Sequence, residues 1–149
     1  MTFIGEHIAK LDDKGRLIFP SEFRAQAGTL NTQYVIHRNI HEDDRLEMYP
    51  LDEWEKYAEK VKAKLNLLTR EGSSLWAEFN RGRAMVTPDE KMGRMTIPKH
   101  LLEAIKVQKE VVFYGLDNMI QIWSKEAWDG WNLSAGRSDF AKRFDDLMR

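Results

Sequence analysis

The sequence contains no cysteine among its 149 residues. This absence excludes disulfide bonds, thiolate zinc sites and cysteine nucleophiles, and it is compatible with a reducing compartment. No stretch approaches the roughly 20 apolar residues that a membrane-spanning helix needs, and the first residues lack the basic and apolar regions of a signal peptide. We therefore expect a cytoplasmic protein whose stability comes from packing and assembly.

The chain also has little excess charge. Lys and Arg total 23 against 24 Asp and Glu, a formal net charge of -1. The overall field of such a protein does not attract phosphate, so any nucleic-acid surface must be local. The chain has five Trp, four Tyr and seven Phe, enough aromatic side chains to fill subunit interfaces as well as cores.

Known catalytic patterns are missing too. We find no nucleophile elbow, phosphate-binding loop or dinucleotide fingerprint, and we predict no catalytic residue, cofactor or small-molecule substrate. His37 and His41 have the spacing of a metal-binding pair on a helix, but the residues around them predict a hairpin. The acidic residues 42–44 could add oxygen ligands, but we interpret this segment as a solvated acidic loop and not as a metal site.

What the chain does contain is an internal repeat, which decides its architecture. Residues 15–20 (GRLIFP) recur as 93–98 (GRMTIP), an offset of 78 (93 minus 15). Farther along, Trp54 matches Trp128 at an offset of 74 (128 minus 54), so the second copy is four residues shorter. The missing residues fall where a hairpin loop tolerates changes in length.

Each copy predicts the same succession of elements. An extended segment leads through a glycine-centred turn to a second extended segment that ends in proline, then to a short helix and a hairpin. In the first copy the extended segment lies around 6–11, the helix at 21–27 and the hairpin strands at 33–37 and 45–49. In the second copy the corresponding ranges are about 84–87, 99–105, 110–114 and 119–123.

Between the copies, three-and-four spacing of apolar residues predicts a helix over 52–70 with one buried face. The apolar positions on that face are Trp54, Tyr57, Ala58, Val61, Leu65 and Leu68. Asp52 with Glu55 fits a capping box. Gly72, followed by Ser73 and Ser74, would end this helix and begin a shorter one.

The C-terminal stretch predicts a docking helix or a partly mobile tail. After Gly136, Ser138 is a plausible helix cap, and Phe140, Phe144 and Leu147 share one face. Together these patterns predict an α+β protein of two tandem halves in pseudo-twofold arrangement. The expected boundaries are a first half at 1–54, a helical linker at 55–80, a second half at 81–131 and a C-terminal helix or tail at 132–149.

The first glycine-centred turn carries the chemistry that suggests a function. Gly15 permits a positive φ angle, so Lys14 and Arg16 can project from a rigid turn. Arg can bind guanine or phosphate through two parallel hydrogen bonds, whereas Lys suits a point contact with phosphate. A carboxylate at Asp12 can accept turn amides or pair with Arg16, which would orient the guanidinium before binding.

The segment 12–16 (DDKGR), with Pro20 and Arg24, resembles the Asp-x-x-x-Arg signature of the MraZ family and the related start of AbrB-type regulators. The resemblance spans nearly the whole chain up to about Trp131. It implies two AbrB-like halves of the swapped-hairpin type. It also implies a DNA-contact role for Arg16, with Lys14, Lys10 and Arg24 as supporting cations and Asp12 and Gly15 as supports of the motif.

The second copy departs from this signature. Glu90 stands where the family usually has Asp, Met92 replaces a residue that is usually polar, and Leu102 stands at the position of Arg24. Arg94 and Lys91, with Glu90 and Gly93 as supports, could contact DNA from alternating positions. Alternatively, this copy could mainly complete the fold.

One copy offers about three cations, so a single protomer should bind DNA weakly. The resemblance implies a homo-oligomeric ring, an octamer or dodecamer, that repeats the motif along direct repeats in double-stranded promoter DNA. In the family that DNA lies upstream of the division and cell-wall genes, and regulation is usually repression. Binding to this DNA implies that the protein associates with the nucleoid. The alternatives are an AbrB-like oligomeric interaction module without DNA binding and, more remotely, a hydrolase.

Overall fold

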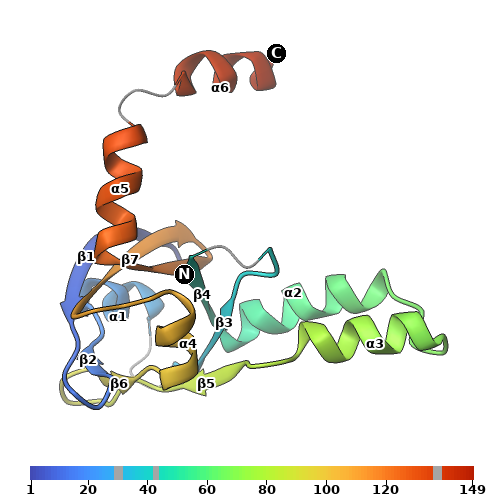
Figure 1. Cartoon of the computed structure of the whole chain (residues 1–149), viewed down its shortest axis with the longest axis horizontal. Coiled ribbons are helices and arrows are strands. Elements are labelled where there is room, and N and C mark those ends of the chain that lie inside the picture. The colour runs from blue at the N-terminus through green and yellow to red at the C-terminus, as the bar shows by residue number, and fades with distance from the viewer. Residues whose placement is uncertain (29–31, 42–43, 136–138) are drawn as a thin grey trace.

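A computed structural model describes residues 1–28, 32–41, 44–135 and 139–149 of the chain. Within these residues the chain forms eight strands and six helices, which confirms the α+β prediction (Figure 1). In chain order the first elements are β1 (Phe3–Lys10), β2 (Arg16–Ile18), α1 (Ser21–Ala27), β3 (Tyr34–Arg38), β4 (Arg45–Pro50) and α2 (Leu51–Ala63). Then follow α3 (Arg70–Phe79), β5 (Ala84–Val86), β6 (Arg94–Thr96), α4 (Lys99–Ala104), β7 (Glu110–Asp117), β8 (Met119–Ser124), α5 (Lys125–Ala135) and α6 (Phe140–Met148).

The two halves exchange strands. Six antiparallel strands form one sheet in the order β1-β7-β8-β4-β3-β5, and β2 pairs with β6 in a separate two-stranded ribbon. Interchanging the halves maps this order onto its own reverse, as pseudo-twofold symmetry requires. The register agrees, since His7 pairs with Phe113 and Ile36 pairs with Ala84, and both exchanges are offset by 77 (113 minus 36, and 84 minus 7). The predicted tandem halves and both hairpins are therefore confirmed.

The main core lies between one face of the large sheet and the segments that carry β2, α1, β6 and α4. Its fully buried side chains come from both halves, including Phe3, Phe19, Phe23, Ile97 and Phe113. Phe19 contacts Phe113 edge-on, with ring centroids 5.6 Å apart. Because β1 and β5 each lie beside the other half's hairpin, the halves share this core and bury it together.

Three helices begin directly after a proline. Pro20, Pro50 and Pro98 stand at the N-caps of α1, α2 and α4, with φ between -55° and -54°. The proline ring restricts φ to this region, which suits the entry to a helix. The carbonyl of Pro20 accepts the amides of Phe23 and Arg24, and the carbonyl of Pro98 accepts those of Leu101 and Leu102. Repeated proline thus sets where each strand turns into its helix.

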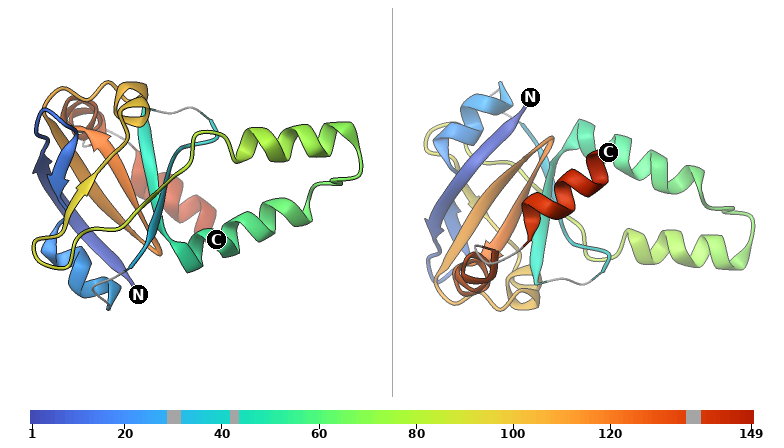
Figure 2. Two further views of the ribbon diagram at one scale, coloured as in Figure 1. Left: turned by 90° about the horizontal axis from the view of Figure 1, so that it is seen from below. Right: turned by 90° about the horizontal axis from the view of Figure 1, so that it is seen from above.

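The helices between the halves differ from the prediction. The helix predicted over 52–70 ends at Ala63, and α3 begins at Arg70 after Thr69, whose hydroxyl accepts the amide of Gly72. Gly72 is thus inside α3 and does not end a helix. Figures 1 and 2 show α2 and α3 side by side as an arm that extends from the sheet. Leu68, predicted to be buried, lies in the connection and is 97% exposed.

The predicted capping box is also wrong. Within the described part of the chain no side chain caps α2, and Asp52 Oδ1 accepts the amide of the next residue, Glu53, at 2.9 Å. The helix does bury one face as expected, since Trp54 is buried and Tyr57, Ala58 and Val61 pack beside it. Phe79 from α3 stacks on Trp54, with centroids 5.4 Å apart, and closes this second cluster.

The end of the chain does not dock on the sheet. Helix α6 has no buried residue, and Phe140, Phe144 and Leu147 are all exposed. The helix begins after Asp139; the predicted cap Ser138, like Gly136, lies outside the described residues. Glu42 and Asp43 of the predicted acidic loop also lie outside them. Within the described residues, no helix has the length and apolar character needed to cross a bilayer.

Candidate nucleic-acid interface

The ribbon of β2 and β6 brings the two repeated turns onto one surface. Leu17 pairs with Met95 at its centre, and both side chains are buried. Because strand residues alternate between faces, the neighbouring pairs point the opposite way. These are Arg16 with Thr96 and Ile18 with Arg94. Side chains of paired residues share a face, so Arg16 and Arg94 lie diagonally on the outward face of the ribbon.

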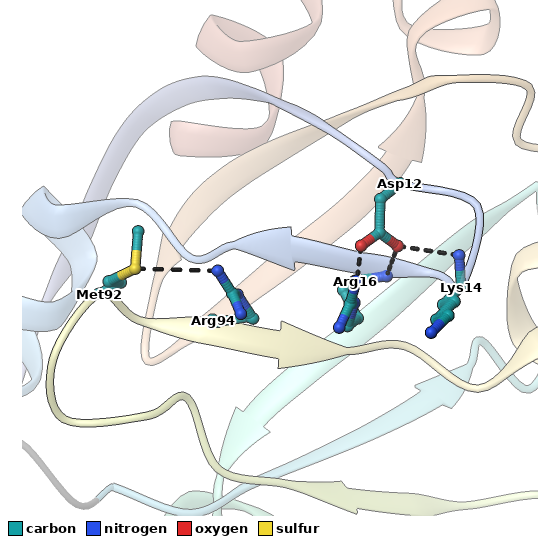
Figure 3. Close-up of polar contacts among 5 residues, drawn as sticks. All are labelled: Asp12, Lys14, Arg16, Met92 and Arg94. Atoms are coloured by element: carbon teal, nitrogen blue, oxygen red, sulfur yellow. Dashed lines mark hydrogen bonds and ion pairs between the residues drawn. The ribbon is translucent and has the colours of Figure 1, made fainter.

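The first turn is held by a single carboxylate. Asp12 Oδ1 accepts the backbone amides of Lys14 and Arg16, each at 2.9 Å. Oδ2 accepts Nε of Arg16 at 2.6 Å, as Figure 3 shows. The backbone closes the turn as well, since the Asp12 amide donates to the Arg16 carbonyl at 2.9 Å and Gly15 has a φ of 77°. The predicted roles of Asp12 as acceptor of turn amides and partner of Arg16 are therefore confirmed as geometry.

These contacts keep Asp12 ionised. The hydrogen bond from the Arg16 amide lowers the pKa of Asp12 most, and the Arg16 side chain and the Lys14 amide lower it further, against a smaller opposing effect of desolvation. Hydrogen bonds to a carboxylate favour its charged form. The guanidinium of Arg16, whose side chain is 43% exposed, is thus held by an ionised carboxylate at neutral pH while part of it faces solvent.

In the second turn, Asp89 takes the place that the offset of 78 assigned to Glu90. The Asp89 amide donates to the Arg94 carbonyl at 2.9 Å, as Asp12 does to Arg16. Asp89 Oδ1 accepts the amides of Met92 and Gly93 at 2.8 and 3.1 Å. The second turn is one residue longer than the first, so the carboxylate moves back by one position. Glu90 therefore is not the counterpart of Asp12.

The two arginines have different surroundings. Arg94 is exposed, and its Nη2 lies 3.9 Å from Sδ of Met92 (Figure 3). Asp89 accepts hydrogen bonds from backbone amides. The positive charge of Arg94 helps to lower the pKa of Asp89. Arg16 is thus held in one direction, whereas Arg94 is bonded to no carboxylate among the described residues.

The other predicted cations are distributed around the ribbon. Lys14 and Lys91 lie exposed on the first and second turns, and Lys10 is exposed at the end of β1, where it pairs with Glu110. Arg24 is different, because its guanidinium bonds to the backbone of the second turn. The structure therefore brings Lys10, Lys14, Arg16, Lys91 and Arg94 to the ribbon and its turns, and commits Arg24 to an internal contact.

Sequence reasoning missed Asp89 and the contact of Arg24 with the second turn. A signal for Asp89 was present, since an Asp four positions before Gly93 stands in for an Asp three positions before Gly15. The contact of Arg24 depends on how the halves pack, so no local pattern marks it. Within the described residues, no group of three or more His, Asp or Glu is placed to hold a metal ion.

A ribbon of this kind can enter DNA. The major groove of B-DNA admits a two-stranded β-ribbon, and arginine on such a ribbon can bond to guanine or to phosphate. Diagonal neighbours on a ribbon are roughly 7–8 Å apart, or about two base-pair steps of 3.4 Å. Two outward arginines and two lysine-bearing turns therefore suit contact with successive positions of a duplex.

Comparison with known proteins identifies the family of the chain. A family model described as "MraZ protein, putative antitoxin-like" matches residues 2–72 and 79–147. The chain is 33% identical over 146 residues to the transcriptional regulator MraZ of Caldanaerobacter subterraneus, covering 97% of both chains. It is 37% identical over 133 residues to that of Clostridium acetobutylicum, covering 89% of each, and 35% identical over 147 residues to that of Halothermothrix orenii, covering 97% of this chain and 98% of the relative.

Proposed function

The chain belongs to the MraZ family, and the relatives it matches are named transcriptional regulators, not enzymes. We propose that it binds specific DNA sequences through the β2–β6 ribbon. It would act in the cytoplasm at the nucleoid, as a repressor of the promoter of the division and cell-wall genes. The observation that carries this proposal is the outward placement of Arg16 and Arg94 on one ribbon, with Arg16 held by Asp12.

Pre-orientation supports specific contact over a loose charge interaction. A free arginine loses rotamer freedom when it binds, and this ordering costs affinity. The Asp12 carboxylate already holds Nε of Arg16, which leaves the terminal nitrogens of the guanidinium to face a base or a phosphate. Arg16 is therefore the residue proposed to read sequence, while Lys14, Lys10 and Lys91 contact phosphates and Arg94 adds a second guanidinium.

The local charge is modest, which supports assembly. The exposed acids Asp13 and Glu90 lie on the same two turns as Lys14 and Lys91. A single ribbon therefore gains few counterion-releasing contacts, and each is weakened by salt. We propose that a ring of subunits, an octamer or dodecamer, places several ribbons on direct repeats of promoter DNA, so that linked weak contacts add up to useful affinity.

A second candidate function is an oligomeric interaction module without DNA binding. The observation that favours it is a shallow groove of about 430 Å³ beside the ribbon, lined in part by Ile8, Ile18 and Met92. These three side chains are 57%, 44% and 54% exposed. Exposed apolar groups next to a groove are typical of contacts between proteins. Under this reading the ribbon would contact another protein chain.

The experiment that separates these functions is a mobility-shift titration with the duplex upstream of the protein's own coding region. We expect salt-sensitive binding that exceeds binding to a shuffled duplex, and loss of the specific complex in Arg16→Ala. Arg143→Ala is the matched control, because Arg143 lies on α6, at the opposite end of the molecule from the ribbon (Figure 1). Circular dichroism and light scattering would verify that both variants fold and assemble. Full affinity of Arg16→Ala, or equal affinity for both duplexes, would refute the proposal.

A further inference from the structure

Arg24, on α1 of the first half, contacts the turn of the second half. Its Nη2 donates to the carbonyl oxygen of Glu90 at 2.7 Å and lies 3.4 Å from that of Asp89. Its aliphatic stem covers Gly93, where an added β-carbon would lie 2.8 Å from Cδ of Arg24. The side chain is half-buried. Both the charge and the stem of Arg24 are therefore engaged with the second turn.

The pseudo-symmetric site at the first turn is filled by a different residue. Leu102, on α4, stands 78 positions after Arg24 and covers Gly15, with its Cδ1 3.3 Å from an added β-carbon. The first turn does not need a cation there, because the Asp12 carboxylate bonds to the Arg16 side chain. In the second turn, Asp89 holds backbone amides but accepts no bond from the Arg94 guanidinium among the described residues. The guanidinium of Arg24 supplies the additional restraint from outside.

We propose that Arg24 is a positioning residue for the second turn and does not itself contact DNA. By bonding to the carbonyls of Asp89 and Glu90, it fixes the turn from which Lys91 and Arg94 project. Turning Nη2 toward a phosphate would leave these carbonyls without their charged donor, which is unfavourable. The inference rests on the proposed DNA-binding function and replaces the DNA-contact role that the family pattern suggested for Arg24.

The first arm of the test needs no DNA. Arg24→Leu gives the second turn the side chain that the first turn already has, and Arg24→Lys keeps the charge without the planar fork. In Arg24→Leu we expect the NMR amide signals of residues 89–94 to shift. Their hydrogen exchange should become about 10-fold faster, because one charge-assisted hydrogen bond is lost. Arg24→Lys should show a smaller change, while the amides of 12–16 stay unchanged. Arg143→Leu is the control, and unchanged amides at 89–94 in Arg24→Leu would overturn the proposal.

The second arm is a double-mutant cycle with the upstream duplex. If Arg24 acts through the second turn, Arg24→Leu as a single change weakens DNA binding several-fold. Added to a protein that already carries Lys91→Ala and Arg94→Ala, it has little further effect on binding. If Arg24 contacts phosphate itself, its loss adds fully in both backgrounds and lowers the salt slope by about 0.9. Full additivity would overturn the proposal. Failure of the wild type to bind the duplex would refute the proposed function alone, because the amide measurements still decide whether Arg24 holds the turn.

Discussion

Nε2 of His37 lies 3.1 Å from Oε1 of Glu47, across the pair of neighbouring strands β3 and β4. The His37 side chain is fully buried, and its ring packs against Trp54 with centroids 5.0 Å apart. Arg83, whose guanidinium lies over the Trp54 ring at 5.2 Å, adds a positive charge to the same cluster. Among the described residues, Tyr49, Tyr57 and Arg45 are further titratable groups around this pair.

This arrangement predicts that mild acid destabilises the protein. Burial lowers the pKa of His37 below its ordinary value of 6.5, and Arg83 adds to the decrease, although the contact with Glu47 opposes it. Below pH 6.5 the unfolded chain therefore takes up a proton that the folded chain does not, so stability falls as the pH decreases. The His37 contribution to the slope can reach about 1.4 kcal/mol per pH unit. Urea denaturation between pH 7.5 and 5 measures it.

Two variants isolate this effect. His37→Gln removes the titrating ring and should flatten the dependence of stability on pH in this range, whereas His100→Gln, at an exposed histidine, should not.

A second loss of stability is expected in stronger acid, through Glu47. Burial by itself raises the pKa of Glu47, but the contacts with His37 and Asn39 and the charge of Arg45 together lower it below 4.5. Its contribution is present above pH 4.5 and is lost as the pH falls through the lowered value.

Asp12 and Asp13 provide a matched pair for the proposed reading turn. Both variants to Ala remove one negative charge near the DNA, which by itself should favour binding. Asp12→Ala also removes the acceptor that holds the Arg16 guanidinium and two turn amides. We therefore expect affinity to fall on the order of 10-fold for Asp12→Ala, through lost pre-orientation, and to stay equal or rise for Asp13→Ala. Fluorescence anisotropy with the upstream duplex distinguishes them, and equal behaviour of the two variants would argue against pre-orientation.

Gly93 and Gly28 separate backbone strain from steric conflict. Both have positive φ, 79° and 81°, a conformation that costs an alanine roughly 1–2 kcal/mol. An added β-carbon at Gly93 would also meet Arg24, whereas at Gly28 it would meet no described residue within 4 Å. We expect Gly93→Ala to lose about 1 kcal/mol more stability than Gly28→Ala. Chemical denaturation of both variants checks this, and an equal loss would mean that Arg24 moves aside freely.

Removal of residues 139–149 should leave the fold as stable as before. No residue of α6 is buried, so its loss removes no packing from the described core. We expect the free energy of unfolding to change by less than about 0.5 kcal/mol, the range of surface changes. The free energies of unfolding of the full-length and shortened chains are compared at two protein concentrations. A loss that grows with concentration would show instead that the apolar face of Phe140, Phe144 and Leu147 is buried between copies.

Much of the fold could be predicted because the chain repeats itself. Two copies of the same pattern located the turns, short helices and hairpins. The exchange of β1 and β5 between the halves was implied only by the resemblance to swapped-hairpin halves, because from the residues alone strands of similar pattern can pair within or between halves. The end of α2 was missed because the apolar spacing of the helix continues past its last residue. Leu65 and Leu68 continue the helical spacing beyond Ala63, although the chain has already left the helix.

The candidate site was predicted where its contacts are local in sequence. Asp12 and Arg16 are four residues apart, so turn chemistry alone suggested their bond. Asp89 was missed because one extra residue in the second turn breaks the fixed offset between the copies. The DNA-contact role of Arg24 was carried over from the family pattern, and its actual contact lies more than sixty residues away in the chain, where only the packing of the two halves could place it.

The exchange of strands also sets when the protein can first fold during synthesis. β1 leaves the ribosome first, but its neighbour β7 begins at Glu110. At about 5–20 residues per second, the nascent first half waits roughly 5–20 s for the strand that completes it. During that delay the unpaired edge of β1 is open to a neighbouring nascent chain on the same messenger RNA. Chaperone capture, or slow translation just after β7, would therefore affect the yield of this protein more than that of one whose halves fold independently.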